Sequence, residues 1–453
     1  MKDFDRSKNF KDSFILIGLC LLLFLYLLFV TDKMPYMDYW NGMSVYIPHV
    51  LNDPVNLKEI FHLPHILHWN PLYSLVDYIY IRVFKFNNQV YIFSGMAFSF
   101  IIFYIIYRYY HQNFRPENKK LLITGLLIYM LMVFNLNQWE ILTMSCILPF
   151  MFRIMIYILC FMGLDRLLKK DASAGKYICC ILFGISNMII IFLISQAYYP
   201  GFASAIIGAC LLNLILIHDK KNIFPCIFII LCNALGTAGC YLTTDMSTTP
   251  IVVSSEGGGI IEYIKGFLIM LGGTITPTFV LVRTHIISYI IGTAIFILVV
   301  YALILYFSKK QNHIAYFPVM CLIYAFVSIV IIIMGRLKGY GLESLGTSRY
   351  VVDTTLGLLG LVHIFMTSYQ AEDFKNKRYA MIILALGAMV FLSSCFELAI
   401  SPFRRQYYHS LVEMAENPSN YSDEDLSSFQ ADPQEVRKGI ETLKEYKLCI
   451  WSD

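Results

Sequence analysis

Apolar stretches long enough to cross a membrane recur along almost the whole chain. A membrane span needs about 20 mostly apolar residues. Stretches that approach this length lie at 12–31, 89–109, 120–135, 139–164, 177–195, 201–218, 223–243, 259–281, 286–307, 314–335, 350–370 and 379–400. The first stretch is too long for a cleaved signal peptide and no small-residue cleavage site follows it, so we interpret it as a retained helix. The pattern predicts an all-α integral membrane protein.

Composition leads to the same class. Of the 453 residues 58% are hydrophobic and 15% are charged, whereas soluble domains have about 45–50% and about 25%. A soluble fold this apolar could not cover its surface with polar groups, which excludes a cytosolic enzyme, a disordered chain and a secreted disulfide scaffold. The 12 cysteines lie almost entirely in apolar runs without a CxxC pair, so they predict neither a zinc site nor a disulfide framework.

Basic residues predict the orientation, because lysine and arginine favour the cytoplasmic side. Six segments hold 19 of the 35 basic residues, and they begin near Lys2, Arg108, Arg166, Lys220, Lys309 and Lys375. All six fall on one side only if the stretch 259–281, which is rich in glycine and carries two charges, does not fully cross. This gives about 11 spans, with the N-terminus inside and the C-terminus outside.

The predicted outer side carries most of the polar chain. It contains a long first loop at 32–88 and a polar tail at 401–453 with a short helix expected around 433–447. We therefore divide the chain into a polytopic domain, 1–400, and a short extracytoplasmic tail, 401–453, without a core of its own. No internal repeat is evident, which disfavours carriers built from inverted repeats.

The first outer loop holds the richest set of candidate residues. Asp38 lies among Tyr36, Tyr39 and Trp40 directly after the first helix. At the membrane boundary such a carboxylate has either a raised pKa or a basic partner, and either suits a general base. The alternative is an interfacial aromatic belt with an incidental aspartate.

The same loop continues with a row of histidines. His62, His65 and His68 recur every third residue, and Trp69 and Asn70 follow. On a helix the three imidazoles share nearly one face, where they could bind a metal or hydrogen-bond a sugar or lipid headgroup. No acidic residue is close in sequence, so we predict no metal and assign His65, His68 and Asn70 to substrate binding.

A second candidate cluster opens an apolar stretch on the outer side. Trp139 and Glu140 follow Asn135, Asn137 and Gln138. A flat aromatic ring next to a carboxylate suits a sugar ring and its hydroxyls, whereas a carboxylate at a helix N-terminus also simply favours the helix dipole. Both interpretations stay open.

Other polar residues stand at or inside the apolar stretches. Gln196 follows Ser195 at another outer helix end and is assigned to substrate binding. Arg153 and Asp353 lie within predicted spans, where charges are usually functional or paired.

The third cluster is the segment GRLKGYGLESLGTSRY. Arg336, Lys338 and Arg349 place three cations on the outer side, against the charge bias of the rest of the chain. Guanidinium groups bind phosphate in a bidentate manner, so we predict a lipid-phosphate site here that includes Tyr350. The alternative is a flexible basic loop that touches anionic headgroups.

These motifs, in this order, resemble those of a known family. The first-loop aspartate, the HWNP segment at 68–71, the QWE that opens a helix and the GR…SRY loop are similar to those of bacterial polytopic glycosyltransferases of the GT-C fold, including O-antigen and phage-type glucosyltransferases. The resemblance covers roughly residues 12–400; at 68–71 relatives often read EHRP. It implies an inverting sugar transfer from a polyprenyl-phosphate sugar, with Asp38 as the catalytic base and Arg336 and Arg349 on the lipid phosphate.

We therefore expect a hexosyltransferase-type enzyme in the bacterial cytoplasmic (inner) membrane, with its active site facing outward. Its expected partners are a polyprenyl-phosphate sugar donor, a cell-surface glycan acceptor and membrane lipid, without cofactor or nucleic acid. The main alternative is a transporter or flippase of a lipid-linked saccharide, which should carry charge along an interior path rather than at one face. A structural membrane protein without catalysis is the third possibility.

Overall fold

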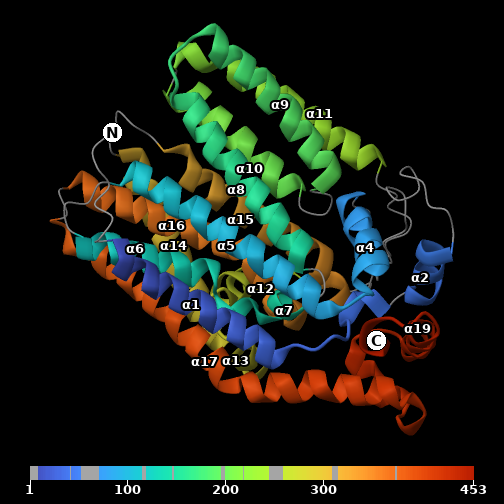
Figure 1. Ribbon diagram of the computed structural model, residues 1–453. Helices are drawn as coiled ribbons and strands as arrows, with labels where there is room; N and C mark the ends of the chain where they lie inside the picture. The colour runs from blue at the N-terminus through green and yellow to red at the C-terminus, as the bar shows by residue number, and fades with distance from the viewer. Residues whose placement is uncertain are drawn as a thin grey trace. The chain divides into compact units, whose positions relative to one another are not determined.

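A computed structural model describes the chain except for residues 1–8, 41, 53–70, 115–118, 145–146, 195–198, 218, 244–258, 309–314, 373–374 and 453 (Figure 1). Every regular element in the described part is a helix. The all-α class that the apolar pattern predicts is thereby confirmed.

Ten helical segments in the described part are long and apolar enough to cross a membrane. They are α5 (Asn88–Asn113), α6 (Lys119–Val133) with its continuation through α7 (Trp139–Thr143), α8 (Ile147–Lys169), α9 (Ala174–Ile194), α10 (Tyr199–Leu212) with its continuation η4 (Asn213–Ile217), α11 (Ile223–Thr243), α14 (Ile286–Ser308), α15 (Tyr316–Tyr340), α16 (Val351–Ala371) and α17 (Lys377–Glu416). The first apolar stretch forms α1 (Asn9–Val30), a helix of 22 residues. The prediction of about 11 spans counts α1 together with these ten.

The stretch at 259–281 is two short helices rather than one span. α12 (Ile260–Gly273) has 14 residues and α13 (Thr278–Arg283) has six. At 1.5 Å per residue, α12 is about 21 Å long, less than the roughly 30 Å of a bilayer core. This is the length expected of a segment that does not fully cross.

The predicted stretch 139–164 is interrupted. α6 ends at Val133, the turn η2 (Leu136–Gln138) and the short helix α7 follow, and α8 begins only at Ile147. The asparagine before η2 explains the stop, because the Asn135 side chain accepts a hydrogen bond from the backbone N–H of Asn137 and so competes with helix continuation.

The chain forms two compact units. The first unit comprises residues 1–51, 80–152 and 372–453, and the second comprises 52–79 and 153–371. In the first unit α1, α5, α6 and α17 pack on one another. α17 is a single 40-residue helix with Pro402 inside it, and Figure 1 shows it bending along its length, as expected where proline removes a backbone hydrogen bond.

The end of the first unit is also helical. Beyond α17 come α18 (Asp423–Leu426) and α19 (Pro433–Glu445), and α19 contacts the turn η1 (Met37–Trp40) that follows α1. α2 (Met43–Asn52) and α4 (Pro71–Phe84) complete the N-terminal third.

In the second unit the principal pairs are α9 with α11, α15 with α16, α10 with α15, and α12 with α14. The α12–α14 pair is packed backbone to backbone. A Cβ added at Gly272 would lie 2.1 Å from the Ser288 carbonyl oxygen, and one at Gly292 would lie 2.2 Å from the Leu268 carbonyl oxygen. Only glycine permits this approach, which is the usual way that helices pack closely in membranes.

Candidate functional site

The turn that carries Asp38 is held among tyrosines of the first unit. The description covers the backbone of Asp38 in η1 but not its side chain. Tyr36 is buried and meets Tyr407 and Tyr408 edge-on, with ring centroids 5.8 and 5.5 Å apart. Burial raises the pKa of Tyr36 well above its ordinary value, and the neighbouring tyrosines and Glu140 raise it further. The segment that leads to Asp38 is connected to the helix of Glu140 through Tyr408, whose hydroxyl is 2.6 Å from that of Thr143 in α7.

The two aromatic residues after Asp38 pack into the first unit. Tyr39 is partly buried, and its ring centroid is 5.7 Å from that of Phe86 and 6.3 Å from that of Tyr91. Trp40 is completely buried, and its indole N–H donates to the Pro35 carbonyl oxygen at 3.2 Å. Their roles as substrate contacts stay predictions.

Trp139 and Glu140 are buried where α6 gives way to α7. Their exposed fractions are 7% and 5%. Glu140 lies in the first turn of α7, so the helix-dipole interpretation of the sequence remains open beside the sugar-binding one. The hydroxyl groups of Thr143 and Tyr408 are 2.6 Å apart, which links α7 to α17.

Sequence reasoning missed the polar groups that α17 adds. Arg404 lies over the Trp139 ring, 3.5 Å from its centroid, and its Nη2 is 3.4 Å from Glu397 Oε2. Glu397 is fully buried, and its Oε1 has no hydrogen-bond partner in the described part; neither has the buried indole N–H of Trp139. The sequence did contain a signal for this pair. Glu397 interrupts an apolar stretch, and Arg404, seven residues later, lies on the same face of a helix.

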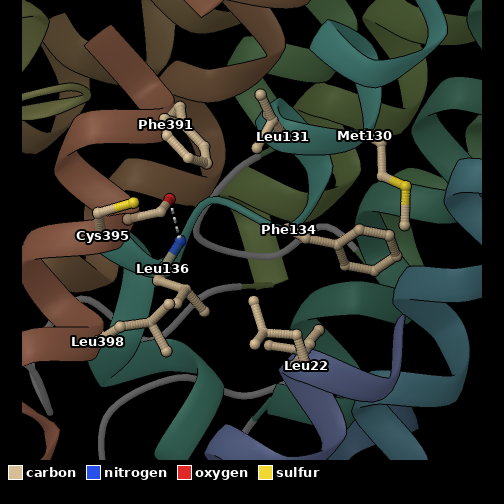
Figure 2. Close-up of a pocket in the computed structure, with 10 residues that line it drawn as sticks. Leu22, Met130, Leu131, Phe134, Leu136, Phe391, Cys395 and Leu398 are labelled. Carbon is tan, nitrogen blue, oxygen red and sulfur yellow. Dashed lines mark hydrogen bonds between the residues drawn. The ribbon is translucent and has the colours of Figure 1, made fainter. Parts of the chain in front are cut away.

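The same part of α17 also lines an apolar pocket of the first unit, with Ser394, Cys395 and Leu398. Figure 2 shows its walls, which come from α1, α6, η2 and α17 and include Leu22, Phe134, Leu136 and Leu398. The polar lining atom drawn is the Ser394 hydroxyl oxygen, which accepts a hydrogen bond from the Leu136 backbone N–H at 3.3 Å. Apolar cavities stay dry, so this pocket offers no place for an ionic or sugar group.

The predicted phosphate site lies in the second unit. Arg336 is near the end of α15, and its guanidinium carbon is 5.1 Å from the Tyr340 ring centroid. Arg349 lies in the turn η8 (Ser348–Tyr350), donates to the Thr347 hydroxyl at 3.4 Å and has its guanidinium carbon 5.6 Å from the Tyr350 ring centroid. Lys338 is exposed, whereas Tyr350 is buried.

The loop that carries these cations is packed rather than free-standing. The turn η7 (Leu342–Gly346) contacts α12, α13 and α15. Leu345 is buried, and a Cβ built on Gly266 of α12 would lie 2.7 Å from its side chain. The two short helices α12 and α13 therefore pack against the loop that carries the cations.

The two charges inside predicted spans are paired. Arg153 of α8 and Asp353 of α16 form a buried ion pair with 2.8 Å between Nη2 and Oδ1, and the Tyr324 hydroxyl donates to the same carboxylate oxygen. Charges within membrane spans are usually either functional or paired, and these two are paired.

Several predicted residues lie outside the described part. These are His62, His65, His68, Asn70 and Gln196. Within the described part no group of three His, Cys, Asp or Glu side chains is placed to hold a metal ion.

The first unit thus contains the Asp38 turn, Trp139 and Glu140, and the second contains Arg336 and Arg349. Carboxylates can accept a proton from a hydroxyl, and guanidinium groups can bind a phosphate and stabilise it as it leaves. No protein-family model matches the chain, and no curated protein or solved structure is detectably similar to it.

Proposed function

We propose that this protein is a membrane glycosyltransferase. It transfers a sugar, with inversion, from a polyprenyl-phosphate sugar to a cell-surface glycan at the outer face of the cytoplasmic membrane. Its many apolar helices suit a donor whose polyprenyl tail stays in lipid.

The observation that carries the proposal is the group of buried polar and aromatic residues in the first unit. Tyr36 lies two residues from Asp38 and packs edge-on against Tyr408, whose hydroxyl is 2.6 Å from that of Thr143 in α7. In the same helix, Trp139 next to Glu140 is covered by Arg404. Burying this many polar groups within apolar helices is costly unless they are paired or functional. The unpartnered Glu397 oxygen and Trp139 N–H are groups that a hydroxyl-rich ligand can satisfy.

The proposed roles follow from the reaction. Asp38 removes the proton from an acceptor hydroxyl, whose oxygen attacks the anomeric carbon from the face opposite the phosphate. The bond between that carbon and the phosphate oxygen breaks, and polyprenyl phosphate leaves. Arg336 and Arg349 bind the phosphate and stabilise the negative charge that it gains.

The test is sugar transfer by the purified protein in proteoliposomes that contain a panel of polyprenyl-phosphate sugars. We expect release of polyprenyl phosphate with one donor and a product of inverted anomeric configuration, read by NMR. Asp38→Asn should lower turnover by about 100-fold or more, the size of a general-base contribution. Asp32→Asn is the matched control, because its carboxylate also follows the first helix and accepts a hydrogen bond from the neighbouring Lys33 N–H. Undiminished turnover in Asp38→Asn would remove Asp38 from the mechanism.

The same vesicles test the transporter alternative. A flippase moves the lipid-linked sugar across the bilayer without releasing polyprenyl phosphate. Movement of the headgroup in the absence of any sugar transfer, unchanged by Asp38→Asn, would favour the transporter.

A further inference from the structure

We infer that the C-terminal segment after α17 is a brace that fixes the position of the Asp38 turn, with Phe429 and Gly439 as its positioning residues. This inference rests on the proposed function, because it assigns the brace to the general base of that reaction. Three separate contacts carry it, and all lie within the first unit.

The first contact is with Trp40, the last residue of the Asp38 turn. Its ring meets Phe429 edge-on, with centroids 4.8 Å apart. On another side it lies against α19, where a Cβ added at Gly439 would be 2.9 Å from the indole Cε3. Trp40 is 0% exposed, so the indole is enclosed by its neighbours and by its own bond to the Pro35 carbonyl. Trp40 therefore packs against the C-terminal segment on two sides.

The second contact is with Tyr36, on the other side of Asp38. The Tyr407 hydroxyl donates to the Ser428 carbonyl oxygen at 2.6 Å and accepts from the Tyr36 hydroxyl at 3.2 Å. One tyrosine thus ties the segment before Asp38 to the residue next to Phe429.

The third contact is at Cys449, near the end of the chain. Its backbone N–H donates to the Lys85 carbonyl oxygen at 2.7 Å, and its thiol donates to the Lys33 carbonyl oxygen. Residues on both sides of Asp38, from Lys33 to Trp40, are therefore held by the C-terminal segment.

The brace is well suited to hold another segment because its apolar side chains are buried. Apolar residues of α18, α19 and the turns beside them are fully buried, namely Leu426, Phe429, Val436, Ile440, Leu443 and Cys449. Its helices are also capped. Ser422 and Asp425 form a reciprocal capping box, and the Asp432 side chain accepts from two backbone N–H groups at the start of α19.

The turn η1 needs such support. It has only four residues, and short 3₁₀ turns have poor hydrogen-bond geometry of their own. A general base must lie within hydrogen-bond reach of the proton that it removes, and a displacement of about 1 Å can cost on the order of 100-fold in rate. Loosening the brace should therefore lower kcat and leave donor KM nearly unchanged.

The experiment compares two glycine-to-alanine variants in helices. Gly439→Ala places a methyl group against the enclosed Trp40 ring, whereas Gly239→Ala in α11 adds a methyl group that, among the described residues, meets no atom within 4 Å outside its own helix backbone. We expect Gly439→Ala to lower kcat at least about 10-fold and to speed hydrogen exchange in the peptide that covers residues 36–40. Gly239→Ala should change neither. Phe429→Ala, which removes the other wall of the Trp40 site, should repeat the effect, and Phe429→Leu should restore part of the activity.

Hydrogen exchange tests the brace, and kcat tests its role in the proposed reaction. Unchanged exchange at residues 36–40 in both Gly439→Ala and Phe429→Ala would overturn the brace. Faster exchange with full kcat, next to an inactive Asp38→Asn, would overturn the positioning role and leave the proposed function standing. Full activity of Asp38→Asn would overturn the proposed base and its positioning together, whatever the exchange data show.

Discussion

The ion pair between Arg153 and Asp353 in the second unit offers a test of how charge is tolerated inside this protein. The two side chains are 2% and 0% exposed, and 2.8 Å separates Nη2 from Oδ1. Asp353→Leu leaves a buried guanidinium without this counter-charge, and Arg153→Met leaves a buried carboxylate without its cation. The Tyr324 hydroxyl bonds the same carboxylate oxygen, so Tyr324→Phe removes a neutral member of the network.

The magnitudes follow from burial. Removing one partner of a buried pair costs about 3–5 kcal/mol, a large share of the roughly 5–15 kcal/mol that stabilises a typical protein. The double variant, Arg153→Met with Asp353→Leu, exchanges the pair for apolar side chains and should be near neutral. Tyr324→Phe should cost about 1.5–3 kcal/mol, as for a hydrogen bond to a charged group.

The assay is thermal unfolding of the four variants and the wild type in one detergent, together with sugar transfer by the double variant. We expect both single variants to unfold well below the wild type, the double variant to recover, and its turnover to persist because the pair is structural. A double variant as unstable as the sum of the two single variants would refute the argument that the charges compensate each other. A stable double variant without turnover would show that the pair has a role in the reaction.

Three further predictions concern the proposed sites and the topology. Arg349→Ala should nearly abolish turnover at saturating donor, and Arg349→Lys should reduce it clearly because lysine keeps the charge but loses the planar fork. Lys338→Ala should have a milder effect. Retained turnover in Arg349→Ala with an altered acceptor preference would assign this loop to the acceptor instead. Arg404→Gln should lower the unfolding temperature more than Glu397→Gln, because the carboxylate is fully buried whereas the arginine side chain is 19% exposed and can hydrate; equal shifts would contradict this asymmetry. A cysteine introduced at position 425 should react with impermeant thiol reagents from outside the cell, and labelling from the cytoplasmic side alone would overturn the predicted orientation.

The helices of this protein could be predicted well from the sequence because the bilayer dictates their length and apolarity. The distribution of basic residues, with the glycines and two charges in 259–281, also predicted that this stretch does not fully cross, and the short helices α12 and α13 have the corresponding lengths. Boundaries were harder. The break between Val133 and Ile147 depends on side-chain caps such as Asn135, which an apolar window does not detect.

The candidate site could be predicted only in part. Asp38, Trp139 and Glu140 stand out because a polar residue among aromatics at a span end is unusual. Glu397 and Arg404 were missed because their significance lies in what they meet, the Trp139 ring and each other. The contact of Arg404 with Trp139 joins residues more than 250 positions apart, and no local pattern specifies that pairing, although the spacing of Glu397 and Arg404 on one helix face is visible in the sequence.

The composition of the chain changes near residue 400, but its packing does not. α17 continues through Pro402 to Glu416 without ending at the polar boundary. Because α1 and α17 pack side by side, the residues that follow the apolar part of each helix come together, as the contacts of Tyr36 with Tyr407 and Tyr408 show. The orientation predicted from basic residues already places 32–40 and 401–408 on one side of the membrane, and helix packing makes them neighbours. The polar end of α17 and the segment after it therefore belong with the Asp38 turn in any account of the reaction, and variants designed from the first 400 residues alone would leave out these neighbours.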